Sequence, residues 1–216
     1  MKGFSKWNRA GMFCVLVVLN AAIATAQDKS ERNTPRMEIF SLFSVSRDHP
    51  PNASSTGAGV VTPGWLYGYN GGCASNLTRS LDLVLEVSIL GGYRNVLSGT
   101  SADSTAKREF AQTVLLLAGP QFKMRKHPLL QPFARGLMGF SYQGVTHRAN
   151  YAGFAAGLGG GLDLVLLRRY AVRIIQYDFL AHTGPNGWTD YHRVSFGVVF
   201  QFGGNLESGR PADNRK

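Results

Sequence analysis

Hydrophobic and polar residues alternate one by one along much of this chain, which is the two-residue period of a β-strand. The stretch near the C-terminus is the clearest example, with bulky apolar residues at every second position and smaller, polar or charged residues between most of them. A strand places residues of such a pattern on opposite faces of a sheet. The apolar face here comprises Val194, Phe196, Val198, Phe200 and Phe202, and the other face comprises Arg193, Ser195, Gly197, Val199 and Gln201.

Similar segments, rich in Val, Leu, Phe, Tyr and Gly, recur along the chain, and none has the spacing and caps of an amphipathic helix. Eight of them can be delimited, and closed single-chain bacterial barrels have an even number of strands. The pattern therefore predicts an all-β fold, an eight-stranded antiparallel transmembrane β-barrel with up-and-down meander topology. The expected strands are residues 36–46, 67–77, 81–92, 109–124, 130–142, 152–166, 170–181 and 191–203.

The connections between these segments alternate in length, which favours a membrane barrel. Long loops on one rim and tight turns on the other are typical of a barrel with both chain ends in the periplasm. A soluble up-and-down barrel gives no reason for such a rule. The longer connections are residues 47–63, 94–108, 143–151 and 182–190, and the short ones are residues 78–80, 125–128 and 167–169.

Charged residues indicate which face of each strand points inward. Burying Asp82, Asp163 and similar residues in a dry apolar interior would be costly unless every charge were paired. A membrane barrel instead shows its apolar face to lipid and keeps a polar interior. We therefore expect a narrow polar lumen with a charge network that plugs it, formed by Glu86, Arg135, Asp178 and Arg193. Simple satisfaction of inward polar positions is favoured over an ion gate.

Two strands do not follow the pattern. In the segment 170–181, Arg173 lies on the face opposite to Gln176 and Asp178. Either a β-bulge shifts the alternation, or Arg173 extends along the outer face to the lipid headgroups; we favour the second interpretation. The first strand, around Glu38–Phe43, has apolar residues on both faces, so its pattern does not indicate which face points inward.

Aromatic residues are concentrated near the ends of the expected strands. Amphipathic rings favour the depth of the membrane–water interface. We expect interfacial positions for Trp65, Tyr93, Trp188, Tyr191 and Phe202.

The first residues have the features of a secretory signal peptide. A basic start with Lys2, Lys6 and Arg9 precedes an apolar run that is too short for a spanning helix, and small residues end at Ala26. The expected organisation is a signal peptide at 1–26 cleaved before Gln27, a short linker at 27–35, the barrel at 36–203 and a polar tail at 204–216. The mature protein is then expected in the bacterial outer membrane.

Without the signal peptide, Lys and Arg fall from 23 to 20 against 13 Asp and Glu, a net charge of +7. The basic residues are scattered and do not alternate with aromatic residues as in single-strand nucleic-acid sites. The expected partners are therefore outer-membrane lipids and lipopolysaccharide rather than nucleic acid. Cys73 is the one cysteine left after cleavage, so no intramolecular disulfide is expected.

Catalytic, cofactor and metal sites are not predicted. An outer-membrane barrel could modify lipid A with a His and a Ser, but His192 and Ser195 are three residues apart and so lie on opposite faces of a regular strand. Metal ligands usually occur at clustered spacings, whereas the histidines here are isolated along the chain. The enzyme candidates considered are His147, His182 and His192 with Ser141 or Ser195, and Glu86 or Asp178 as orienting acids; the remaining histidines are His49 and His127.

Several segments resemble the small bacterial outer-membrane β-barrel proteins of the OmpA-like transmembrane type, a porin-like group. The likeness covers most of residues 36–203 and is strongest in the second half. It implies an eight-stranded barrel, insertion by the barrel assembly machinery, and an aromatic residue near the end of the last strand, where Phe202 stands. The segments are 118–122, 132–141, 159–163, 172–178 and 193–203.

Three functional hypotheses remain open. A structural or surface-interaction role through the extracellular loops, toward a ligand that the sequence does not name, is favoured because an eight-stranded barrel is only wide enough for its own side chains. A small porin that passes ions or small solutes is the alternative. An enzyme that modifies lipid A is the second alternative.

Overall fold

A computed structural model describes residues 35–49, 60–61, 64–98, 105–145, 150–167, 169–184 and 187–203. In this part of the chain all regular elements are strands, and no helix there could span a membrane. The strands are β1 (Met37–His49), β2 (Val60–Val61), β3 (Trp65–Asn76), β4 (Leu81–Ser98), β5 (Thr105–Lys123), β6 (Leu130–Val145), β7 (Tyr151–Leu167), β8 (Tyr170–Gly184) and β9 (Gly187–Phe202).

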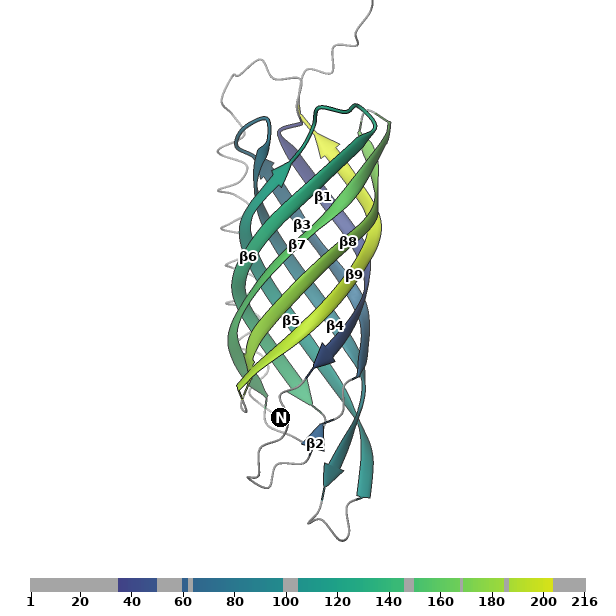
Figure 1. Cartoon of the computed structure of the whole chain (residues 1–216), viewed down its shortest axis with the longest axis vertical. Coiled ribbons are helices and arrows are strands. Elements are labelled where there is room, and N and C mark those ends of the chain that lie inside the picture. The colour runs from purple at the N-terminus through teal and green to yellow at the C-terminus, as the bar shows by residue number, and fades with distance from the viewer. Residues whose placement is uncertain are drawn as a thin grey trace, which may run out of the picture.

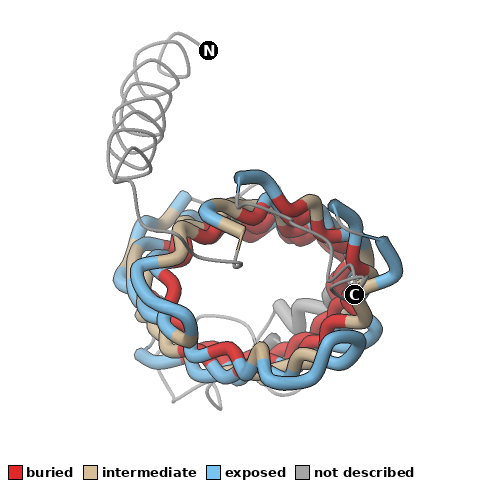
Figure 2. The backbone as a smooth tube through the Cα atoms, turned by 90° about the horizontal axis from the view of Figure 1, so that it is seen from above, coloured by how far each residue is buried: buried red, intermediate tan, exposed pale blue. Residues whose placement is uncertain are grey.

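The strands form one closed antiparallel barrel (Figures 1 and 2). Apart from the two-residue β2, each strand pairs with its neighbours in sequence, and β1 closes the ring by pairing with β9 over the full length from Met37↔Phe202 to His49↔Asp190. An eight-stranded, up-and-down barrel is therefore confirmed. In the described part of the wall that all eight strands share, closure leaves no open sheet edge, which is what a lipid environment requires of a β-structure.

One rim carries the short connections from β3 to β4, from β5 to β6 and from β7 to β8, and we call it the short-turn rim; the opposite end is the long-loop rim. The hairpin of β4 and β5 extends past the other strands at the long-loop rim (Figure 1). Its ladder continues to Ser98↔Thr105, so most of the loop expected at 94–108 is paired strand. The short β2 adds to this hairpin through Val60↔Leu97 and Val61↔Val96.

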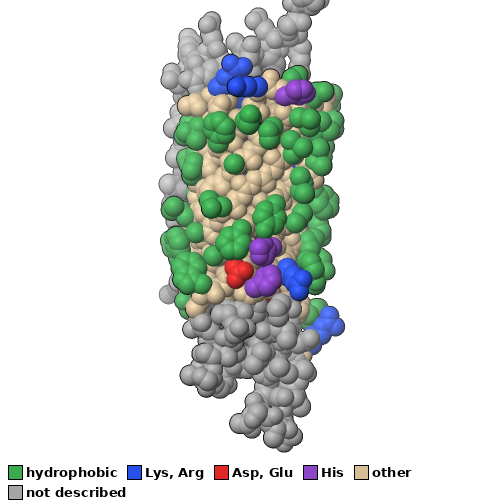
Figure 3. Space-filling view, in the orientation of Figure 1, with side chains coloured by type: hydrophobic (Ala, Val, Ile, Leu, Met, Phe, Trp, Pro, Cys, Tyr) green, Lys and Arg blue, Asp and Glu red, His purple; other side chains and the backbone are tan. Residues whose placement is uncertain are grey.

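The two faces of the wall differ as the alternation predicted. In β9, Phe196 is 52% exposed, whereas Arg193 is fully buried. In β4, Leu83 is outward, and Asp82 and Glu86 are inward. Hydrophobic side chains spread over the visible outer face, and charged and histidine side chains gather near its two ends (Figure 3). An apolar belt between polar rims is the surface of a barrel that sits in a membrane.

The structure defines the inward faces of the two strands with irregular patterns. In β1, Glu38 and Leu42 face the lumen, and Ile39 faces outward. In β8, a register shift between Arg173 and Gln176 marks a β-bulge, and Arg173 is 1% exposed. The favoured interpretation, with Arg173 on the outer face, was wrong: the extra residue brings Arg173 to the same side as Gln176, because a bulge reverses the alternation beyond it.

Four of the five expected interfacial aromatic residues lie on the outer face, and one does not. The side chains of Trp65, Tyr93, Trp188 and Phe202 are 46–57% exposed. Tyr191, in contrast, is 1% exposed. It lies two residues before Arg193 and so shares the inward face, where its ring stacks on that of His182 at 4.8 Å.

Several predictions fall outside the described residues. These are the signal peptide at 1–26, most of the linker at 27–35, the tail at 204–216 and the candidate His147.

Candidate functional site

The four residues expected to form a charge network meet inside the barrel, and we call them the central cluster: Glu86, Arg135, Asp178 and Arg193. They come from β4, β6, β8 and β9, so only closure of the barrel brings them together. Arg135 donates to both oxygens of Asp178, with Nε–Oδ1 and Nη2–Oδ2 distances of 2.9 Å, and its Nη1 lies 2.7 Å from Glu86 Oε2. This two-pronged geometry is the strong form of an Arg–carboxylate pair.

Arg193 completes the central cluster from the other side. Its Nη2 lies 2.5 Å from Glu86 Oε1 and 2.8 Å from Asp178 Oδ2. Its Nη1 donates to the hydroxyl of Ser88, which itself donates to Glu86 at 3.1 Å. Each acid of the cluster therefore forms ion pairs with both arginines, and each arginine forms ion pairs with both acids.

A second group of charges lies toward the short-turn rim, and the sequence pattern did not indicate that its members meet. We call it the rim cluster: Glu38, Asp82, Lys123, Arg125, Asp163 and Arg173.

Within the rim cluster, Lys123 Nζ lies 2.6 Å from Glu38 Oε2 and 2.8 Å from Asp163 Oδ2. Arg173 donates to both oxygens of Asp163, at 2.7 and 3.1 Å. The inward position of Asp163 was a signal that a base must face it. Because of the β-bulge in β8, the sequence pattern did not indicate Arg173 as that base.

The side chain of Gln176 joins the two clusters. It accepts a hydrogen bond from Arg173 Nη1 at 2.6 Å and donates to Asp178 Oδ2 at 2.8 Å. The Arg173 guanidinium also lies between two rings, 4.2 Å from the centroid of Phe133 and 5.1 Å from that of Phe40. The polar network is thus continuous, and aromatic faces enclose part of it.

Arg125 closes the network at the short-turn rim. It belongs to the turn between β5 and β6, and its Nη2 contacts Asp82 at 2.9 Å and Glu38 at 3.2 Å. Burial works to lower the pKa of this guanidinium, but the adjacent carboxylates of Glu38 and Asp82 outweigh burial and raise that pKa above its ordinary value. Arg125 therefore carries its positive charge at neutral pH.

The two clusters balance in charge: five bases face five acids. None of these ten side chains is more than 4% exposed. The rest of the lumen contains buried apolar side chains, including Leu42, Leu90 and Leu180. In the described part of the lumen, the paired charges of the two clusters thus lie among buried apolar side chains.

Most of the enzyme candidates that the structure describes lie on the inner face of the wall. Ser141 Oγ lies 3.4 Å from His182 Nδ1, and both side chains are buried on the inner face of the wall. Gln143 also contacts the His182 ring, at 2.6 Å from Nε2. Ser195 contacts Ser44 at 2.9 Å and lies on the inner face, whereas His192 is on the outer face. His192 and Ser195 are thus on opposite sides of the wall, as their spacing predicted.

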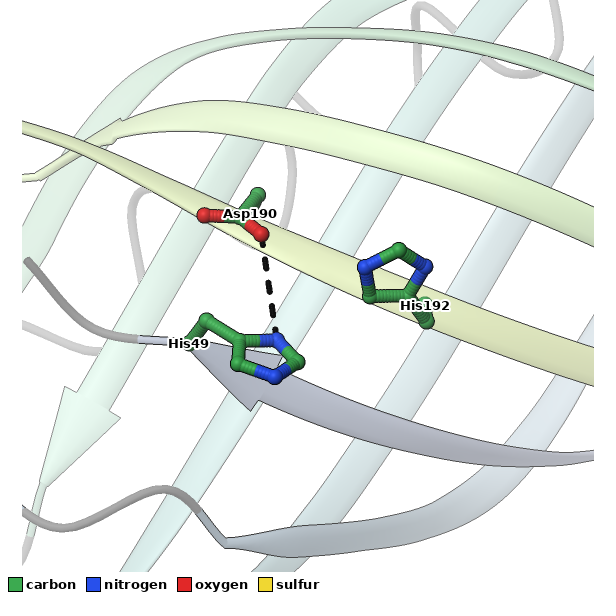
Figure 4. Close-up of side chains that lie close together, drawn as sticks. All are labelled: His49, Asp190 and His192. Carbon is green, nitrogen blue, oxygen red and sulfur yellow. Dashed lines mark ion pairs between the residues drawn. The ribbon is translucent and has the colours of Figure 1, made fainter.

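Two histidines that are isolated along the sequence lie close together on the outer face near the long-loop rim. His49 ends β1 and is the cross-strand partner of Asp190 in β9, and His192 follows on the same face. One ligand atom from each of the three residues lies within 4.8 Å of the others (Figure 4). Sequence spacing could not reveal this group because the pairing joins the first and last strands.

Comparison with known proteins gives similarity in structure but not in sequence. No protein-family model and no curated protein matches the chain. The attachment invasion locus protein Ail of Yersinia pestis, solved with the heparin analogue sucrose octasulfate, has a TM-score of 0.50 and 11% identity, covering 78% of this chain and 99% of that one. Neisserial surface protein A has a TM-score of 0.54 and 9% identity, covering 77% and 97%. Together with the apolar belt and the charged interior, this likeness shows that the chain has the fold of the small outer-membrane β-barrel proteins.

Proposed function

We propose that this protein is a non-conducting outer-membrane barrel whose function lies in the surface presented at its long-loop rim. The observation that carries this proposal is the packed lumen. An aqueous pore would leave its charged lining accessible to water, whereas Arg173, Arg193 and Asp163 are at most 1% exposed. Eight strands leave room for side chains but little more.

The β4–β5 hairpin is the element best placed for a surface interaction. It extends past the other strands and is widened by β2 (Figure 1). Its exposed side chains include Tyr93, whose ring packs edge-on against Phe110 at 5.4 Å and lies 4.6 Å from the Arg108 guanidinium. Exposed aromatic and arginine side chains on a projecting element are typical of binding surfaces.

The apolar belt fits contact with outer-membrane lipids, and the ring of aromatic residues at the long-loop rim fits the headgroups of lipopolysaccharide. Trp65 and Trp188 would lie at that depth, on strands β3 and β9. Insertion by the barrel assembly machinery, with Phe202 in the last strand, belongs to the same proposal.

Conductance tests the closed lumen. The protein purified from membranes in detergent is reconstituted into a planar bilayer, and current is recorded under an applied voltage. We expect no discrete steps in the wild type. A variant with Glu86→Ala and Arg193→Ala removes two side chains that fill the lumen and serves as the open control. Regular wild-type steps would contradict the proposal and favour the small porin.

Cell binding tests the surface role. Sulfated polysaccharide is the first probe, because Ail was solved with a heparin analogue and because the segment between Tyr93 and Phe110 carries three bases, Arg94, Lys107 and Arg108, against two acids, Asp103 and Glu109. Cells that make the wild type are compared with cells that make a hairpin shortened between Tyr93 and Phe110. We expect the shortened form to bind less to the sulfated surface, with an uncharged polysaccharide as the control. Equal binding by both forms would contradict this role.

A further inference from the structure

We propose that His49, Asp190 and His192 form a binding site for one divalent transition-metal ion, such as Zn²⁺, on the outer wall at the long-loop rim. The three side chains point to the same side of two paired strands, β1 and β9 (Figure 4). Figure 3 shows histidine and acidic side chains together near that end of the barrel. Two imidazoles and one carboxylate are a donor set that zinc and its neighbours in the first transition row prefer, whereas Mg²⁺ and Ca²⁺ prefer oxygen alone.

The spacing of the His49 and Asp190 donor atoms fits a shared ion better than a direct contact. His49 Nδ1 lies 3.8 Å from Asp190 Oδ2, too far for a hydrogen bond. That nitrogen is itself inaccessible to solvent and has no hydrogen-bond partner among the described residues. Ligands at 2.0–2.2 Å from a tetrahedral ion lie about 3.4 Å apart. A movement of a few tenths of an ångström would therefore bring this pair to ligand spacing.

His192 already has the outer partner that a metal-binding histidine usually needs. The Tyr177 hydroxyl lies 2.6 Å from His192 Nδ1. Donation from Nδ1–H to that hydroxyl leaves the lone pair of Nε2 for the ion, and such a contact fixes the tautomer and the ring orientation. In Figure 4 one ring nitrogen of His192 faces the other two residues and the second points away. Tyr177 is thus a positioning residue.

The surroundings of the three residues leave room for a positively charged ion and for a fourth ligand. Arg47 is the cross-strand partner of His192, but its guanidinium lies over the Trp65 ring on β3, 5.6 Å from the centroid and on the other side of β1. The side chains of His49 and Asp190 are 43% and 41% exposed, so water can fill a fourth position. Three protein ligands with one open position are the arrangement of an accessible zinc site.

The test is metal binding by the full-length protein purified in detergent and stripped with chelator. Zn²⁺ is titrated by calorimetry, and Co²⁺ is added as a spectroscopic probe whose visible bands report the coordination. We expect one ion per chain and intense bands of a four-coordinate site. His49→Ala, His192→Ala and Asp190→Asn should each abolish saturable binding. Tyr177→Phe should weaken it by about tenfold, because the ligands remain but the ring loses its partner.

His127→Ala is the matched control. It removes another histidine, in the turn at the short-turn rim, where its Nδ1 accepts hydrogen bonds from the backbone of Leu129 and Leu130. The heat-dependent gel shift of a folded barrel confirms that each variant has folded. Absence of saturable binding in the wild type, or equal binding by the wild type and the His49→Ala and His192→Ala variants, would overturn the proposal.

Discussion

The central cluster makes a quantitative prediction for the change Glu86→Gln. Glu86 accepts hydrogen bonds from Arg135 at 2.7 Å, from Arg193 at 2.5 Å and from Ser88 at 3.1 Å. Glutamine has nearly the same shape but carries no charge, and its amide group would point donor hydrogens at a guanidinium. Two buried arginines would then share the single carboxylate of Asp178.

Removing one partner of a buried ion pair typically costs about 3–5 kcal/mol. Both arginines keep their contacts with Asp178, at 2.8 Å in each case, so the loss should fall at the lower end, near 3 kcal/mol. The compensating change Arg193→Met removes the excess positive charge and fills the space with an apolar side chain. The double variant should therefore recover most of the loss, because replacing both members of a buried pair is often nearly neutral.

Urea unfolding in lipid vesicles measures these differences, with tryptophan fluorescence as the signal. Trp65 and Trp188 are on the outer face and report the transfer from the membrane interface to water. The free energies of unfolding of the wild type, the two single variants and the double variant form a thermodynamic cycle. A Glu86→Gln loss below about 0.5 kcal/mol, or strictly additive losses in the double variant, would refute the view of the cluster as a coupled network.

Three further predictions concern the wall. Phe196→Arg, in the middle of β9 on the lipid face, should destabilise the inserted barrel by about 2–4 kcal/mol, whereas Phe202→Arg at the rim should cost about 0–1 kcal/mol. Unfolding in vesicles measures both losses, and equal losses would contradict the depth assignment. Gly159→Ala would place a Cβ against Asp178 Oδ1 and the Tyr177 carbonyl oxygen, so the free energy of unfolding should fall by about 1–3 kcal/mol in the same assay. An unchanged stability would show that Asp178 is free to move. Cys73 lies outward in β3 between Ile39 and Leu85, so it should react with a membrane-permeant maleimide and not with a charged one; labelling by the charged reagent would place it in water.

The sequence determined the wall of the barrel, because alternation is a local property. In β9 and β4 the identity of every second residue decides which face can meet lipid, whatever the rest of the chain does. The residues Asp82, Glu86 and Arg193 could be assigned to the lumen for the same reason. Tyr191 could also have been assigned to the lumen, because it lies two residues before Arg193 and so on the same face. Its residue type suggested the membrane interface instead.

Tertiary structure alone decided what those faces contact. The β8 bulge, which brings Arg173 to Asp163, cannot be read from a pattern that assumes a regular strand. The rim cluster and the central cluster depend on the shear with which eight strands close, since that shear sets which inward residues share a level. The group formed by His49 and His192 arises because closure pairs the two ends of the chain. The local pattern thus determined which side of the wall each residue faces. Only the register of the closed barrel determined which residues meet across the lumen.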